Sequence, residues 1–168
     1  WRAILRVSPY TNSLTLHAAT DRAQFCEKLM PPTELSGARQ GLIELIQKIR
    51  PHDTLEAQQI DATVAWIASG APLYRQGKAD DPPQHLVSYF MLYDASHQKL
   101  LLVDHKKAGL WLPSGGHVEV NEDPQETVAR ECVEELGVEA TFLSDTPLFL
   151  TVTATVGSVA KHVDVSLW

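Results

Sequence analysis

One stretch, Gly116–Val138, constrains the fold of this chain more than any other. Its second part predicts a single short helix. Asp123 is a favourable N-cap, Pro124 suits the first helical position, and Glu126 completes a capping box with Asp123. Gly137 stands where a helix would end in a left-handed cap. The local signals therefore predict both ends of the helix independently of its interior.

The predicted helix has an apolar stripe and an acidic side. The stripe consists of Val128, Cys132 and Leu136, flanked by Ala129 and Val133. On the other side, Glu131 faces Glu134 and Glu135, and like charges at this spacing cost a few tenths of a kcal/mol per pair. A solvated acidic face is one interpretation. The preceding Gly-Gly turn favours a second one, a divalent-cation site, because hard cations join carboxylates to substrate phosphates.

The same stretch resembles the signature of the Nudix hydrolases. That signature is a glycine, five residues, a glutamate, seven residues, and then Arg-Glu-apolar-any-Glu-Glu-any-Gly-apolar. The matching positions are Gly116, Glu122, Arg130, Glu131, Cys132, Glu134, Glu135, Gly137 and Val138. Cys132 stands where a larger aliphatic residue is usual, and a buried cysteine behaves as a small hydrophobe.

The resemblance implies an α/β fold, a Nudix-type α/β/α sandwich with a mixed β-sheet, over residues 85–168. Residues 1–80 are expected to form a mainly helical N-terminal extension. Family members usually continue with further sheet and a second packed helix. We therefore expect that the C-terminal part of the fold is missing from this chain, or that another element covers that face of the sheet.

The resemblance also implies a reaction. Nudix enzymes hydrolyse a nucleoside diphosphate linked to another moiety, with Mg²⁺ or Mn²⁺ and a water nucleophile. The implied metal ligands are Glu131, Glu134 and Glu135, assisted by the carbonyl of Gly115. Glu134 or Glu131 would act as general base, and Arg130 would orient a glutamate through a charged hydrogen bond. The expected cofactor is Mg²⁺, with Mn²⁺ as the alternative ion, and no organic cofactor is implied.

Other residues are weaker candidates. Glu122 is expected to brace the loop before the helix, with a remote role in metal binding as the alternative interpretation. His162 and Asp164 alternate on one predicted strand, so they point to the same side and are candidate substrate contacts; strand-edge polar residues are the alternative interpretation. A different class of function stays open, a Nudix-like domain that binds a nucleotide as a sensor or regulatory module without hydrolysing it.

Composition limits the partners. The formal net charge of −7 over 168 residues argues against a general nucleic-acid binder. Cys26 and Cys132 are far apart and form neither a disulfide framework nor a zinc motif, so a reducing cytoplasm is the expected location. No apolar run is long enough for a transmembrane helix. The expected partner is a small nucleotide diphosphate derivative, no membrane is expected, and a homodimer stays open.

Periodicity and turn signals predict the remaining elements. A hairpin is expected within residues 1–17, and helices are expected at Asp21–Met30, from Thr33 to Pro51, and at Thr54–Ser69. After a linker at residues 71–84, strands are expected at His85–Tyr93, Lys99–Asp104, His117–Val120, Thr141–Leu143, Phe149–Val156 and His162–Trp168. Tyr89, Phe90 and Trp111 could stack on a base, but core packing is the favoured interpretation of each.

Overall fold

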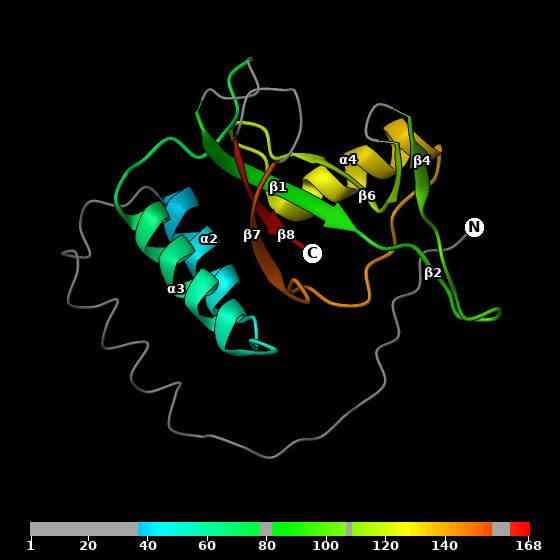
Figure 1. The fold of residues 1–168 in the computed structure, drawn as a ribbon, viewed down its shortest axis with the longest axis horizontal. Coiled ribbons are helices and arrows are strands. Elements are labelled where there is room, and N and C mark those ends of the chain that lie inside the picture. Colours follow the sequence, from blue (N-terminus) through cyan, green and yellow to red (C-terminus); the bar gives the residue numbers. More distant parts are fainter. Residues whose placement is uncertain (1–36, 78–81, 107–108, 156–161) are drawn as a thin grey trace.

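A four-stranded mixed sheet forms the centre of the fold (Figure 1). A computed structural model of the protein describes residues 37–77, 82–106, 109–155 and 162–168. The strands, in spatial order, are β6 (Ser114–His117), β1 (Gln84–Phe90), β8 (Val163–Leu167) and β7 (Leu150–Ala154). β1 runs parallel to β8, and the other two pairs are antiparallel. The predicted mixed sheet with helices is confirmed, while the two-sided sandwich stays a prediction.

Two small ladders lie outside this sheet. β2 (Tyr93–Asp94) pairs with β3 (Lys99–Leu100), and β4 (Val103–His105) pairs with β5 (Leu110–Leu112). The turn between β2 and β3 is held by the Asp94 carboxylate, which accepts hydrogen bonds from the backbone N–H groups of Ser96 and His97. The chain therefore turns between the two strands expected at His85–Tyr93 and Lys99–Asp104, but each of these long strands is divided into two shorter ones.

The helix α4 (Pro124–Leu136) has both of the predicted ends. The Asp123 side chain and the Glu126 side chain form the reciprocal capping box. Gly137 has φ of 66°, and its N–H bonds to the carbonyls of the last helical turn. Cys132 is buried as predicted, whereas Val133 is exposed and does not belong to the buried stripe.

Two helices precede the sheet, α2 (Gly37–Gln47) and α3 (Thr54–Ala68). Asp53 caps the start of α3 by accepting a hydrogen bond from the Glu56 N–H. The guanidinium of Arg39 on α2 donates to the carbonyls of Ile67 and Ala71, both at 2.7 Å, and so caps the other end of α3. Every helix in the described part of the chain is too short or too polar to span a bilayer.

These two helices share one hydrophobic core with the sheet. Its buried members are Leu42, Ile43, Ile46, Ile49, Ile60, Val64, Ile67, Leu73, Leu86, Val118, Leu150, Val165 and Leu167. α3 also satisfies the edge of the sheet, because Glu56 accepts from the Leu150 N–H and Gln59 accepts from the Val152 N–H. Whether residues 1–80 form a separate unit stays a prediction, but α2 and α3 complete the core on which the sheet packs.

Several sequence predictions are wrong in place. The strand expected at His117–Val120 instead lies at Ser114–His117, because the two glycines pair with β1 rather than forming a turn. Thr141–Leu143 is not a strand, and Trp111 is 67 % exposed because no residue of the β4–β5 ladder belongs to the buried core of the described residues. The predictions for residues 1–17, for Asp21–Met30 and for a helix start at Thr33 lie outside the described residues.

Candidate active site

Arg130 stands at the centre of the acidic side of α4. Its guanidinium binds both carboxylate oxygens of Glu122, at 2.8 and 3.1 Å. It also donates to Glu131 at 2.6 Å and to Glu134 at 3.2 Å. A fifth hydrogen bond reaches the carbonyl of His117 on β6. One fixed cation therefore joins three carboxylates and the neighbouring strand, and the carboxylates raise the pKa of Arg130 above its already high ordinary value.

Glu122 braces the loop that leads into the helix, as the sequence predicts. Besides binding Arg130, its carboxylate accepts from the Thr127 hydroxyl at 2.7 Å and from the Glu119 N–H at 3.1 Å. The hydrogen bond from Arg130, offset in part by burial, lowers the pKa of Glu122 to about 2. The residue is therefore a fully ionised structural group at neutral pH.

Gly116 makes room for Glu131. A methyl group on Gly116 would collide with the Glu131 carboxylate, whose side chain is only 12 % exposed. At Gly115 a methyl group would meet backbone instead, namely the Ser88 carbonyl oxygen at 2.5 Å and the Tyr89 Cα at 2.7 Å. The two glycines thus have different functions: Gly115 lets β6 approach β1, and Gly116 lets a carboxylate lie against the strand.

The remaining glutamates face outward. The Glu134 side chain is 58 % exposed, and Glu135 is also exposed. Among the described residues, one group of at least three histidine, cysteine or acidic side chains brings its ligand atoms within 4.8 Å of one another, and these glutamates are not in it. Their oxygen donors nevertheless suit a hard cation such as Mg²⁺, and the Gly116 backbone gives Glu131 room beside the strand. The residues present therefore fit a divalent ion of this class.

The group that does converge is His85, His162 and Asp164. β8 places Asp164 directly opposite His85 on β1, and His162 precedes β8 by one residue. The expectation that His162 and Asp164 share a side is met, since the His162 Nε2 lies 3.4 Å from the Asp164 Oδ1. Contact with substrate stays a prediction for both. The sequence analysis did not identify His85 as a site residue. The signal that could have revealed it is the position of a histidine at the start of a strongly apolar strand.

His117 lies next to this group but is held differently. Its ring centre is 4.9 Å from that of His85, and the Arg75 guanidinium lies 3.2 Å from its Nε2. Burial, reinforced by the positive charge of Arg75, lowers the pKa of His117 to about 4. For His85, burial lowers the pKa, but the contacts with Asp164 and the Pro82 carbonyl outweigh it, and the pKa lies above its ordinary value.

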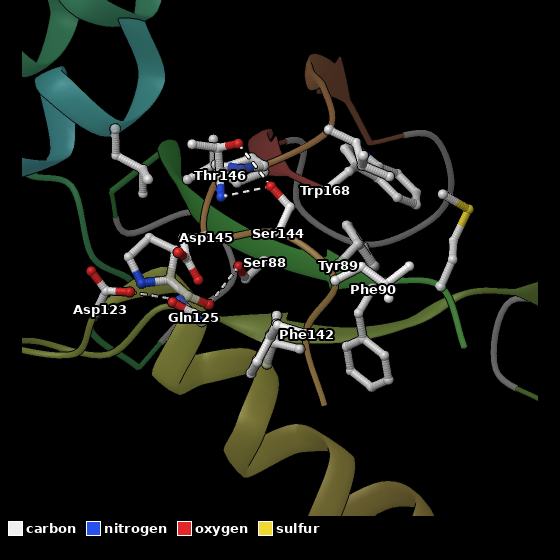
Figure 2. Close-up of a pocket in the computed structure, with 18 residues that line it drawn as sticks. Ser88, Tyr89, Phe90, Asp123, Gln125, Phe142, Ser144, Asp145, Thr146 and Trp168 are labelled. Carbon is white, nitrogen blue, oxygen red and sulfur yellow. Dashed lines mark hydrogen bonds between the residues drawn. The ribbon is translucent and has the colours of Figure 1, made fainter. Parts of the chain in front are cut away.

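A cavity of about 470 Å³ lies beside the first turn of α4 (Figure 2). Its walls come from β1, the start of α4, residues 142–148 and the end of the chain, with Tyr89, Phe142 and Trp168 among them. Tyr89 stacks on Trp168 at 4.9 Å between ring centres. Glu131, Glu134 and Glu135 are not among the described residues that line it.

Comparison with known families gives one match. The NUDIX domain model matches residues 83–166, which is half of the chain. The matched segment contains α4, the strands β1, β6 and β7, and all of β8 except its last residue. Comparison with curated proteins found no match. The matched region contains positions that the signature fixes, among them Gly116, Glu122, Arg130, Glu131, Glu134 and Glu135. The chain belongs to the NUDIX family.

Proposed function

We propose that this protein is a pyrophosphohydrolase that uses a divalent metal to cleave a nucleoside diphosphate linked to another moiety. The observation that carries the proposal is the Arg130 cluster, in which one guanidinium joins Glu122, Glu131 and Glu134 beside the two glycines of β6. Family membership supports the same reaction class. A diphosphate repels an anionic nucleophile, so its hydrolysis needs local positive charge and a positioned water.

The proposed metal ligands are Glu131, Glu134 and Glu135, together with the carbonyl of Gly115. A bound Mg²⁺ or Mn²⁺ would supply the positive charge that the substrate phosphates need and would acidify a coordinated water. The exposure of Glu134 and Glu135 supports this assignment, because an ion there can reach a substrate from solution.

The chain's own groups would then share two tasks. Glu134, or Glu131, would accept the proton of the attacking water as general base. Arg130 would hold both carboxylates in place, since its Nη1 donates to Glu131 and to Glu134 at once. Arg130 is thus a positioning residue, and Glu122 fixes Arg130 in turn through two parallel hydrogen bonds.

The test is a panel of nucleoside diphosphate derivatives, assayed for phosphate-containing products with Mg²⁺ or Mn²⁺. The wild-type protein should turn over at least one member, and a chelator should abolish the activity. Glu134→Gln should lower kcat by about 10²-fold or more, because general-base catalysis contributes on that scale. Its free energy of unfolding should change little, since the Glu134 side chain is largely exposed.

Glu139→Gln is the matched control. Glu139 is an exposed carboxylate just beyond the end of α4 and outside the family signature, so its loss removes the same charge without touching the proposed site. It should keep wild-type activity. Absence of turnover with every substrate and both metals contradicts the proposal. Calorimetric binding of a nucleotide without turnover would instead support a sensor or regulatory module.

A further inference from the structure

We propose that His85, His162 and Asp164 form a second metal site, one that binds a single divalent transition-metal ion such as Zn²⁺. The site is separate from the carboxylates of α4. Ser88 on β1 donates a hydrogen bond to the Pro124 carbonyl, so the even-numbered residues of β1 face α4. His85 is odd-numbered, and its side chain therefore lies on the opposite face of the sheet.

The distances in this group suit a small cation. The Asp164 Oδ1 lies 3.3 Å from the His85 Nε2 and 3.4 Å from the His162 Nε2. A tetrahedral zinc ion with bonds of 2.0–2.1 Å separates its ligand atoms by roughly 3.3 Å. All three ligand atoms lie within 4.8 Å of one another. One ion between them would touch every member of the group.

The hydrogen bonds at the Nδ1 atoms of the two imidazoles bear on which ring nitrogen faces the Asp164 carboxylate. The Nδ1 of His85 lies 3.0 Å from the Pro82 carbonyl oxygen, which can only accept, so Nδ1 carries the proton. The Nδ1 of His162 lies 3.2 Å from the Thr155 hydroxyl oxygen. That hydroxyl donates its own proton to the His162 carbonyl, so it also accepts from Nδ1. Metal-binding histidines typically have their second nitrogen fixed in this way.

Burial makes the group costly without a cation. His85 is fully buried, and within the part of the chain that the structure describes neither its Nε2 nor the Asp164 Oδ1 has a partner with hydrogen-bond geometry, although they face each other. Buried polar atoms without partners are destabilising, and the electron pair of a neutral His85 imidazole directed at a carboxylate would repel it. A bound metal removes this cost. The alternative occupant is a proton on one histidine, which would give an ion pair with Asp164.

The donor set identifies the class of ion. Two imidazole nitrogens and one carboxylate oxygen suit zinc and its first-row neighbours, whereas Mg²⁺ prefers oxygen donors alone. Three protein ligands leave a further coordination position open. His117 is not counted as a ligand, because the guanidinium of Arg75 lies next to both of its ring nitrogens.

The test uses the full chain without an affinity tag, stripped with a chelator and titrated with Zn²⁺ by calorimetry in the presence of excess Mg²⁺. One ion per chain should bind. Asp164→Asn and His162→Gln should each weaken binding by at least about tenfold, because even residues that only support ligands have effects of that size. His162 and Asp164 are partly exposed, so these variants should fold. A substitution of the fully buried His85 could instead prevent folding.

Two controls separate this site from other donors. His97→Gln removes an exposed histidine that also contacts an aspartate, Asp94, and should leave Zn²⁺ binding unchanged. Glu134→Gln should also leave it unchanged. Bound Co²⁺ should show visible absorption bands that Asp164→Asn abolishes. The proposal is overturned if the wild type binds no Zn²⁺, if Asp164→Asn binds as tightly as the wild type, or if only Glu134→Gln loses the ion.

Discussion

The two faces of the sheet treat clustered donor groups in opposite ways. Beside α4, the carboxylates of Glu122, Glu131 and Glu134 surround a guanidinium that belongs to the chain. On the other face, His85 and Asp164 lie 3.3 Å apart without hydrogen-bond geometry, and within the described residues the group has no comparable cation at its centre. The first cluster carries its own counter-charge, whereas the second needs a proton or a metal.

The difference indicates which group stabilises the fold and which recruits a ligand. Arg130 and Glu122 are held by several charged hydrogen bonds each and should stabilise the protein in the absence of any ion. The exposed Glu134 contributes little to stability and is free to serve chemistry. The buried histidine group should gain stability only when its positive charge is supplied.

Removal of Arg130 should have the largest effect on stability. Arg130→Gln leaves Glu122 and Glu131 without their shared cation, and removing one partner of a largely buried charged network typically costs about 3 kcal/mol or more. Activity should fall as well, because both proposed site carboxylates lose their positioning contact. Urea unfolding at pH 7 measures the first effect, and kcat measures the second. Unchanged unfolding would show that the network is only a surface feature.

Glu122→Gln should destabilise the protein by about 3 kcal/mol at pH 7, since each unit of pKa shift corresponds to about 1.4 kcal/mol. The folded-state pKa of about 2 lies below the ordinary value of 4.5. The contribution of Glu122 is therefore fully present above pH 4.5 and is lost as the pH falls toward 2. Urea unfolding at pH 7 and pH 3 should show the gap between wild type and variant narrowing. A gap that is constant with pH would contradict this origin.

Alanine at the two adjacent glycines should have different consequences. Gly115→Ala pushes a methyl group against the β1 backbone and should cost about 1–2 kcal/mol more than Gly116→Ala, as expected of overpacking that cannot relax. Gly116→Ala meets only the flexible end of Glu131, so it should leave unfolding nearly unchanged while lowering kcat. Measurements of the free energy of unfolding and of kcat on both variants would show whether Gly115→Ala mainly lowers stability and Gly116→Ala mainly lowers activity. Equal stability losses would show that both glycines have the same role.

Sequence reasoning succeeded where chemistry and local structure are contiguous. Asp123, Pro124, Glu126 and Gly137 determine the ends of α4 through contacts within a few residues, and all of these features are present in the structure. The cluster around Arg130 follows from the same segment. Such signals depend on backbone groups and neighbours close in the chain, and the sequence displays them directly.

Sequence reasoning failed where the position of a residue depends on segments that are distant in the chain. His85, His162 and Asp164 converge only because β1 and β8 pair in parallel, and no local pattern shows that pairing. The same applies to Trp111, whose exposure depends on the β4–β5 ladder lying apart from the core. A Gly-Gly pair such as Gly115 and Gly116 is typical of a turn, yet these residues form a strand because β1 approaches them closely.

The most direct test of the proposed hydrolysis is to run the reaction in ¹⁸O-labelled water with Mg²⁺ and to follow the products by ³¹P NMR and mass spectrometry. Water attack at phosphorus predicts that one phosphate-containing product carries a single ¹⁸O atom, and that Glu134→Gln yields almost none of it. Cleavage without incorporation of ¹⁸O into a phosphate, or equal labelled product from Glu134→Gln, would contradict the assignment of this chemistry to the carboxylates of α4.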